Sequence, residues 1–167
     1  MKQLKTWKYL STVCASVCAT LFVVLACASD DSKSQSAETM PDDFVVVADF
    51  IPDIIQEIRY HSTYNFVGER ITGYEEPKSI LTRKAAEALK AVSDDVMAQG
   101  YRLKVYDAYR PQCAVDHFVR WAEDVDDTRM KAYFYPEVPK SELFEREYIM
   151  ARSGHTRGST VDLTLFD

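Results

Sequence analysis

Four short segments in the second part of the chain have the alternating or β-branched pattern that predicts β-strands. They are residues 44–48, 54–60, 101–107 and 160–166. In the last segment the aliphatic residues share one face, so Asp162 points to the other. The third segment ends in Asp107, on the same face as its apolar residues, and a carboxylate in that position needs a partner.

Two longer segments have apolar residues at helical spacing. Residues 82–99 can be capped by Thr82 and are followed by Gly100, and their expected buried positions are Ala85, Leu89, Val92 and Val96. Residues 111–123 begin with a proline, which suits the first position of a helix, and their expected buried positions are Val115, Phe118, Val119 and Ala122.

These elements predict an α+β fold in which both helices pack on an antiparallel sheet. We expect strands 101–107 and 160–166 to be central, because they carry Asp107 and Asp162. The chain has 167 residues, of which 47% are hydrophobic, enough for one domain with its own core. We place that domain at residues 44–167.

The first 27 residues have the pattern of an export signal. Three lysines precede an apolar run from Leu10 to Ala26, and Cys27 follows. The run is a little short for a membrane span, which needs about 20 apolar residues. Plain secretion and a retained anchor are the alternatives to a lipoprotein signal with lipid attached at Cys27. Residues 28–43 are polar and predict a tether, so we expect an exported protein, membrane-anchored or periplasmic.

The charge balance bears on the class of partner. The chain has 26 acidic and 20 basic residues, and every acidic residue follows residue 27. An acidic domain disfavours nucleic acid and anionic membrane surfaces as partners, which leaves a lipid anchor as the expected membrane contact. A small ligand fits this balance, and nothing in the sequence indicates an oligomeric state.

Candidate chemistry lies in residues 153–162, which hold His155, Asp162 and two glycines. Fully extended, the seven-residue separation would place the histidine and the acid roughly 23 Å apart. The chain must reverse if both bind one ion, and Gly154 and Gly158 permit a reversal. From the residues alone, a loop histidine beside a surface acid is the more usual interpretation of such a pair. Asp107 and Arg110 form a second candidate pair, either structural or functional.

Several motifs, in order along the chain, resemble those of the zinc D-alanyl-D-alanine dipeptidases, relatives of the vancomycin-resistance dipeptidase. Ser153–Leu165 is similar to the Ser-x-His-x-x-Gly-x-x-x-Asp signature of that family. Other matching blocks are Tyr64–Gly68, Gly73–Tyr74, Val105–Pro111 and Tyr135–Pro136. The resemblance implies a fold like that of zinc DD-peptidases and Hedgehog domains.

The resemblance also implies roles for individual residues. His155 and Asp162 would bind Zn²⁺, and Arg110 would stabilise the oxyanion that develops during attack on the peptide bond. Ser153, Ser159 and Asp107 would orient these groups or contact the substrate. The implied reaction is hydrolysis of the D-alanyl-D-alanine dipeptide, a precursor of peptidoglycan.

One part of the family pattern is missing from the sequence. The family has its third zinc ligand and its general base in a Glu-x-x-His segment toward the C-terminus, and no such segment follows Asp162 here. For this reason we expect a C-terminally truncated chain that lacks the last part of its sheet. We also expect this chain to bind zinc poorly and to be nearly inactive. The alternatives are an active dipeptidase, an inactive homologue that acts at most as a binding module, and a fragment without function.

The lipid anchor is directly testable. Cys27→Ser should release the chain from membranes into the soluble fraction, because the thiol is the proposed site of lipid attachment. Fractionation of cells that express either form measures this, and an unchanged membrane fraction would argue against lipidation at Cys27.

Overall fold

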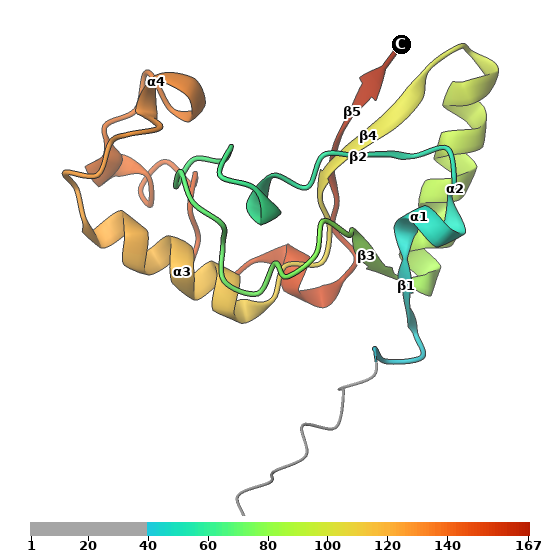
Figure 1. Ribbon diagram of the computed structural model, residues 1–167, viewed down its shortest axis with the longest axis horizontal. Coiled ribbons are helices and arrows are strands. Elements are labelled where there is room, and N and C mark those ends of the chain that lie inside the picture. Colours follow the sequence, from blue (N-terminus) through green and yellow to red (C-terminus); the bar gives the residue numbers. More distant parts are fainter. Residues whose placement is uncertain (1–39) are drawn as a thin grey trace, which may run out of the picture. The chain divides into compact units, whose positions relative to one another are not determined.

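The computed structural model describes residues 40–167 (Figure 1). The predicted signal peptide (residues 1–27), Cys27 and most of the predicted tether (residues 28–43) therefore lie outside the described residues. From residue 40 on, none of the helices has the length and hydropathy needed to cross a bilayer.

The strands form two small sheets. In the first, β1 (Phe44–Val46) pairs antiparallel with β3 (Ile80–Thr82). In the second, the order is β2 (Ile55–Gln56), β4 (Arg102–Asp107), β5 (Asp162–Phe166). The α+β class is thus correct, but the prediction of an antiparallel sheet is wrong in one respect. β2 and β4 are parallel, because a crossover connection that includes a helix separates them in sequence.

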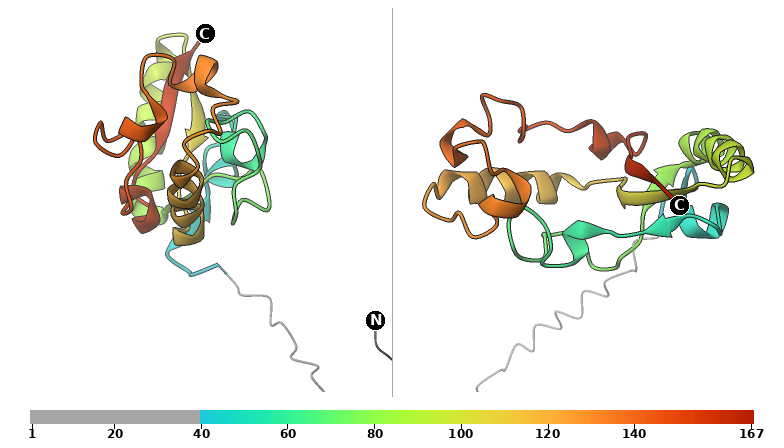
Figure 2. Two further views of the ribbon diagram at one scale, coloured as in Figure 1. Left: turned by 90° about the vertical axis from the view of Figure 1, so that its left-hand side faces the viewer. Right: turned by 90° about the horizontal axis from the view of Figure 1, so that it is seen from above.

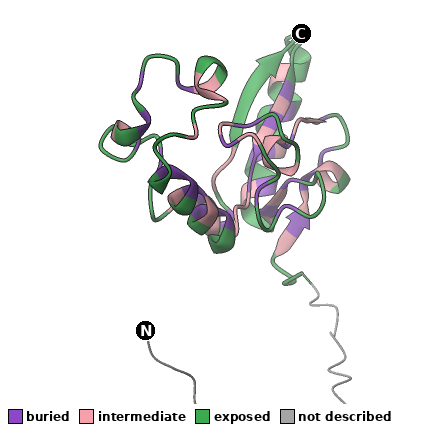
Figure 3. Ribbon diagram, turned by 60° about the vertical axis from the view of Figure 1, so that its left-hand side comes forward, coloured by how far each residue is buried: buried purple, intermediate pink, exposed green. Residues whose placement is uncertain are grey.

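The strand at residues 101–107 is central, whereas the one at residues 160–166 is not. Within the part of the chain that the structure describes, β4 is the one partner of β5, and every residue of β5 is exposed (Figure 3). Leu165, for example, is 53% exposed. The apolar alternation of this strand therefore predicted its conformation but not its burial.

The predicted long helix is α2 (Arg83–Ala98), which lies beside β4 (Figure 2). The Thr82 hydroxyl caps it by accepting from the Ala85 amide, and Gly100 ends it with a positive φ of 88°. Its buried residues are Ala86, Leu89 and Ser93, and Val92 is 49% exposed. Of the expected stripe, Leu89 is buried and Ala85 and Val96 are partly buried against the core, whereas the prediction for Val92 is wrong.

The second predicted helix is α3 (Gln112–Glu123), which starts one residue after Pro111. Instead of lying on the sheet, α3 lies beside the loop after β2 (Figure 1) and packs on it through aromatic rings. The Phe118 ring contacts Tyr60 and Phe66 with centroids 5.0 and 4.8 Å apart, and Trp121 lies 5.2 Å from Phe66. Aromatic pairs at these separations bury much apolar area, which explains why the helix is held away from the sheet.

The remaining elements are short. They are the helices α1 (Val47–Phe50) and α4 (Lys131–Phe134) and the 3₁₀ turns Arg59–His61, Lys140–Glu142 and Gly154–Arg157. The loop after β2 is organised by Asn65, which is 1% exposed. Its amide group donates to the carbonyls of Arg59, Ser62 and Glu69, and its oxygen accepts from Val67 and Gly68. This loop carries Tyr60 and Phe66 to the site described below.

The loop after α3 is held by a buried polar group. Lys140 is 5% exposed, donates to the carbonyls of Asp124 and Asp127, and lies with its ammonium 3.7 Å from the Trp121 ring centroid. Asp127 accepts from the Trp121 indole at 3.0 Å and from two nitrogens of Arg129. The hydrogen bonds from Arg129 lower the pKa of Asp127 from its ordinary 3.8 to about 2.

Asp127 should make stability depend on pH in acid. Because the folded-state pKa is depressed, its contribution is complete above about pH 3.8 and is lost as the pH falls through about 2. Asp127→Asn should therefore lower the melting temperature at neutral pH, and the difference from the wild type should shrink between pH 4 and 2. Circular dichroism melts measure this. Asp126→Asn, at the exposed neighbour, is the control, and a difference that does not vary with pH would contradict the assignment.

Candidate functional site

The site forms where β4 and β5 end beside each other. Asp107 is the last residue of β4 and Asp162 the first of β5, and the two are partners across the ladder. A register shift between Val105 and Asp107 bends β4 at this point. The antiparallel pairing therefore brings together two acids that are far apart in the sequence.

A tight turn brings His155 to the same place. Residues 154–157 form a 3₁₀ turn, and Gly158 follows with a φ of 69°. Any side chain at position 158 would also meet the Phe44 ring, so this position requires glycine in both conformation and space. Of the two predicted glycines, Gly158 makes the reversal, whereas Gly154 lacks a positive φ. The His155 Nε2 atom lies 3.5 Å from Asp162 Oδ1.

The orientation of the imidazole is determined by a backbone carbonyl. His155 is 8% exposed, and its Nδ1 lies 2.8 Å from the Ala108 carbonyl oxygen, which can only accept. Nδ1 therefore carries the hydrogen, and in the neutral ring Nε2 keeps its lone pair. Burial lowers the pKa of His155, but the bonds that the protonated ring can donate to Asp162 and to the Ala108 carbonyl, together with the charge of Asp107, outweigh it, so the pKa is raised overall. The His155 contact in turn lowers the pKa of Asp162.

Asp107 and Arg110 form a buried ion pair. Arg110 donates from Nε and Nη2 to Asp107 Oδ2 at 2.9 and 2.7 Å, and Asp107 is 2% exposed. The Tyr74 hydroxyl donates to the other carboxylate oxygen at 2.6 Å. Burial, followed by the charge of Asp107, raises the pKa of Tyr74, so this hydroxyl stays protonated and keeps donating.

Arg110 also reaches the other residues of the site. Its Nη2 lies 3.5 Å from Asp162 Oδ2, and its Nη1 is 3.5 Å from the Ser153 hydroxyl. Its guanidinium carbon lies 5.2 Å from the centroid of the Tyr60 ring and 5.4 Å from that of Phe118. One cation thus links the end of the sheet, the turn with His155 and the aromatic cluster.

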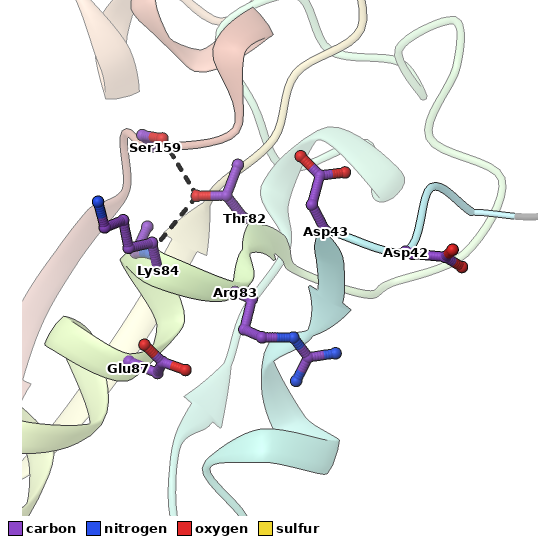
Figure 4. Close-up of a pocket in the computed structure, with 8 residues that line it drawn as sticks. Asp42, Asp43, Thr82, Arg83, Lys84, Glu87 and Ser159 are labelled. Carbon is purple, nitrogen blue, oxygen red and sulfur yellow. Dashed lines mark hydrogen bonds between the residues drawn. The ribbon is translucent and has the colours of Figure 1, made fainter.

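Five of the six residues proposed for the site in the described part of the chain lie together; the sixth does not. Ser153 accepts from the His155 amide at 3.2 Å. Ser159, proposed to orient the site, instead lies at the start of α2, with its hydroxyl 3.2 Å from that of Thr82 (Figure 4). The reason is that Gly158 turns the chain between positions 157 and 159. Sequence reasoning also missed Tyr60, Tyr74 and the Ala108 carbonyl as parts of the site.

Two cavities flank Asp162. One, of about 390 Å³, is lined by Arg110, Ser153, His155, Glu147 and Asp162 among others. The other, of about 200 Å³, is lined by Arg59, Tyr106, Phe134 and Asp162 among others. A larger cavity of about 940 Å³ at the start of α2 contains Ser159 (Figure 4) but none of the clustered residues. Its walls carry both acidic and basic side chains.

The donor set can be judged from the hydrogen bonds. Asp107, His155 and Asp162 each have one ligand-type atom within 4.8 Å of the others. Both oxygens of Asp107 already accept hydrogen bonds, whereas the lone pair of His155 Nε2 and the half-exposed carboxylate of Asp162 face the cavity. Imidazole nitrogen and carboxylate oxygen are ligands that Zn²⁺ accepts. His61 and His117 are bonded elsewhere, to the Tyr74 carbonyl and to Glu69.

Comparison with known proteins agrees with the motifs. The chain is 39% identical to a D-alanyl-D-alanine dipeptidase of Streptomyces coelicolor over 76% of its own length and 63% of the relative's. It is 38% identical to the D-alanyl-D-alanine dipeptidase of Enterococcus faecalis, over 70% of this chain and 60% of that one. An Escherichia coli relative of the same name is 28% identical over 75% and 54% of the two chains. The chain therefore spans about 60% of the length of the first two.

The profile of the Peptidase_M15 family, described as D-ala-D-ala dipeptidase, matches residues 40–167, which include both strands and the turn that form the site. With a match over this range and relatives at this identity, the chain belongs to the D-alanyl-D-alanine dipeptidase family.

Proposed function

We propose that the chain acts in zinc-dependent hydrolysis of D-alanyl-D-alanine. The observation that carries the proposal is the approach of His155 Nε2 and the Asp162 carboxylate, 3.5 Å apart, beside the anchored guanidinium of Arg110. The names of the relatives support the same reaction and substrate. The neighbouring cavities leave room for a short peptide but for little more.

His155 would hold the zinc through Nε2 and Asp162 through its carboxylate. When bound, zinc would polarise the scissile carbonyl and make a nucleophile available at neutral pH. The Ala108 carbonyl keeps the hydrogen of His155 on Nδ1, so the donor atom is preset. A catalytic zinc usually has three protein ligands. Asp107 already accepts two hydrogen bonds on Oδ2 and one on Oδ1, which makes it less available as the third, so we expect weak zinc binding by these residues.

Arg110 would stabilise the oxyanion. Its Nε and one Nη hydrogen are held by Asp107, which prevents the side chain from turning away. The remaining Nη hydrogens point toward Ser153 and Asp162, at the wall of the cavity. A donor that is already oriented needs no reorganisation when negative charge develops, which is the condition for effective stabilisation.

The metal ligands are testable by paired substitutions. His155→Ala and Asp162→Asn should each lower zinc affinity by more than about 100-fold, beyond the effect of losing an outer hydrogen-bond partner. Competition with a chromogenic chelator measures the affinity. The same variants should abolish any zinc-dependent release of D-alanine from D-alanyl-D-alanine. Ser159→Ala is the matched control, and zinc binding that survives His155→Ala would show that the site lies elsewhere.

The ion pair is testable by stability. Asp107→Asn should lower the free energy of unfolding by about 3–5 kcal/mol, because it leaves the buried charge of Arg110 without its partner. Tyr74→Phe removes one hydrogen bond to the same carboxylate and should cost about 1–1.5 kcal/mol. Urea unfolding measures both. Equal losses in the two variants would mean that the charge of Asp107 adds nothing.

A further inference from the structure

We propose, on the basis of the proposed function, that Arg59 binds the C-terminal carboxylate of the dipeptide and makes the site selective for a free carboxyl end. Arg59 lies outside every motif that pointed to the family, at the start of the 3₁₀ turn Arg59–His61. It lines the cavity of about 200 Å³ that Asp162 also lines, whereas Ser153 and Glu147 line the other cavity beside Asp162.

The guanidinium of Arg59 is held in place by aromatic rings. Its carbon lies 4.2 Å from the centroid of Tyr106, 5.7 Å from Tyr64 and 5.9 Å from Phe134. Stacking of this kind restricts the side chain and leaves the edge of the guanidinium plane available for hydrogen bonds. The side chain is 34% exposed, so a ligand can reach it.

The hydrogen-bonding capacity of Arg59 is only partly used. Its Nε donates to Glu57 at 3.1 Å, and no protein atom from residue 40 onward accepts from its Nη groups. Arg110, the other arginine near Asp162, differs because two of its nitrogens are bonded to Asp107. An oriented guanidinium with unpaired Nη groups matches the geometry and charge of a carboxylate.

The charges and the volume of the cavity fit the same ligand. Of the two acids that line it, Asp107 is balanced by Arg110, and Asp162 faces His155. Arg59 is the cation in this lining, and although its Nε is paired with Glu57, its Nη groups remain for an incoming anion. A volume of about 200 Å³ is below the roughly 300–1,000 Å³ of pockets for larger ligands, so it suits a single terminal residue.

The test compares D-alanyl-D-alanine with its C-terminal amide, with the full chain and added zinc. Titration calorimetry measures binding, and D-alanine release measures turnover. Arg59→Gln should weaken binding of the acid by about 10- to 100-fold, the loss expected for a charge-assisted hydrogen-bonded pair. The affinity of Arg59→Gln for the amide should stay within about 2-fold of the wild-type value. In turnover of the acid, the substitution should raise KM and leave kcat unchanged.

Two further variants control for folding and for charge. Arg59→Lys keeps the positive charge without the planar fork and should retain part of the preference for the acid. Arg102→Gln removes an exposed arginine that donates to the Asp53 carbonyl. It should leave the binding affinity for both the acid and the amide unchanged. Thermal melts confirm that each variant is folded.

The outcomes separate this inference from the proposed function. Binding of the acid that depends on Arg59, without release of D-alanine, would support the inference and contradict the function. Release of D-alanine with the same KM in Arg59→Gln would overturn the inference and leave the function intact. Equal weakening of acid and amide would also overturn it, and a folded wild type that binds neither ligand would overturn both.

Discussion

The buried ion pair between Asp107 and Arg110 is the interaction on which the site depends. Asp107 ends a strand whose other inward residues are apolar, and it is 2% exposed. A carboxylate there would be costly without compensation, and two nitrogens of Arg110 and the Tyr74 hydroxyl together provide it. The hydrogen bonds that make the burial of Asp107 tolerable are the same ones that orient Arg110.

This pair lies between two parts of the fold that also share one hydrophobic core. On one side is the small sheet with α2, and on the other are α3 and the loop that contains Tyr60 and Phe66. Arg110 lies over the rings of Tyr60 and Phe118, so its side chain extends from the end of the sheet into the aromatic cluster. The same cluster, on which α3 packs, lines the cavities beside Asp162 through Tyr60 and Phe66.

The two arginines near Asp162 are held in different ways. One edge of the Arg110 guanidinium is hydrogen-bonded to Asp107, which fixes its orientation. A fixed orientation suits a donor that would stabilise charge at the reacting carbonyl. Arg59 is held by rings and keeps its Nη groups unpaired, which suits recognition of a carboxylate. Asp162 lies between the two cavities and contacts His155 and Arg110, so the candidate metal position is shared by both.

The sequence by itself determined the local elements and most members of the site. Thr82 and Gly100 delimit α2 because capping and a left-handed end are local properties, and the motif around His155 and Asp162 pointed to a metal pair. Only the tertiary structure decided that β2 is parallel to β4, that β5 lies at an edge of the sheet within residues 40–167, and that Ser159 turns away to α2. It also decided that Tyr74 joins Arg110 as a partner of Asp107, and it decided the tautomer of His155. Those features depend on strand pairing and on contacts between residues about 30 to 50 positions apart, such as Tyr74 with Asp107 and His155 with Ala108, which no local pattern encodes.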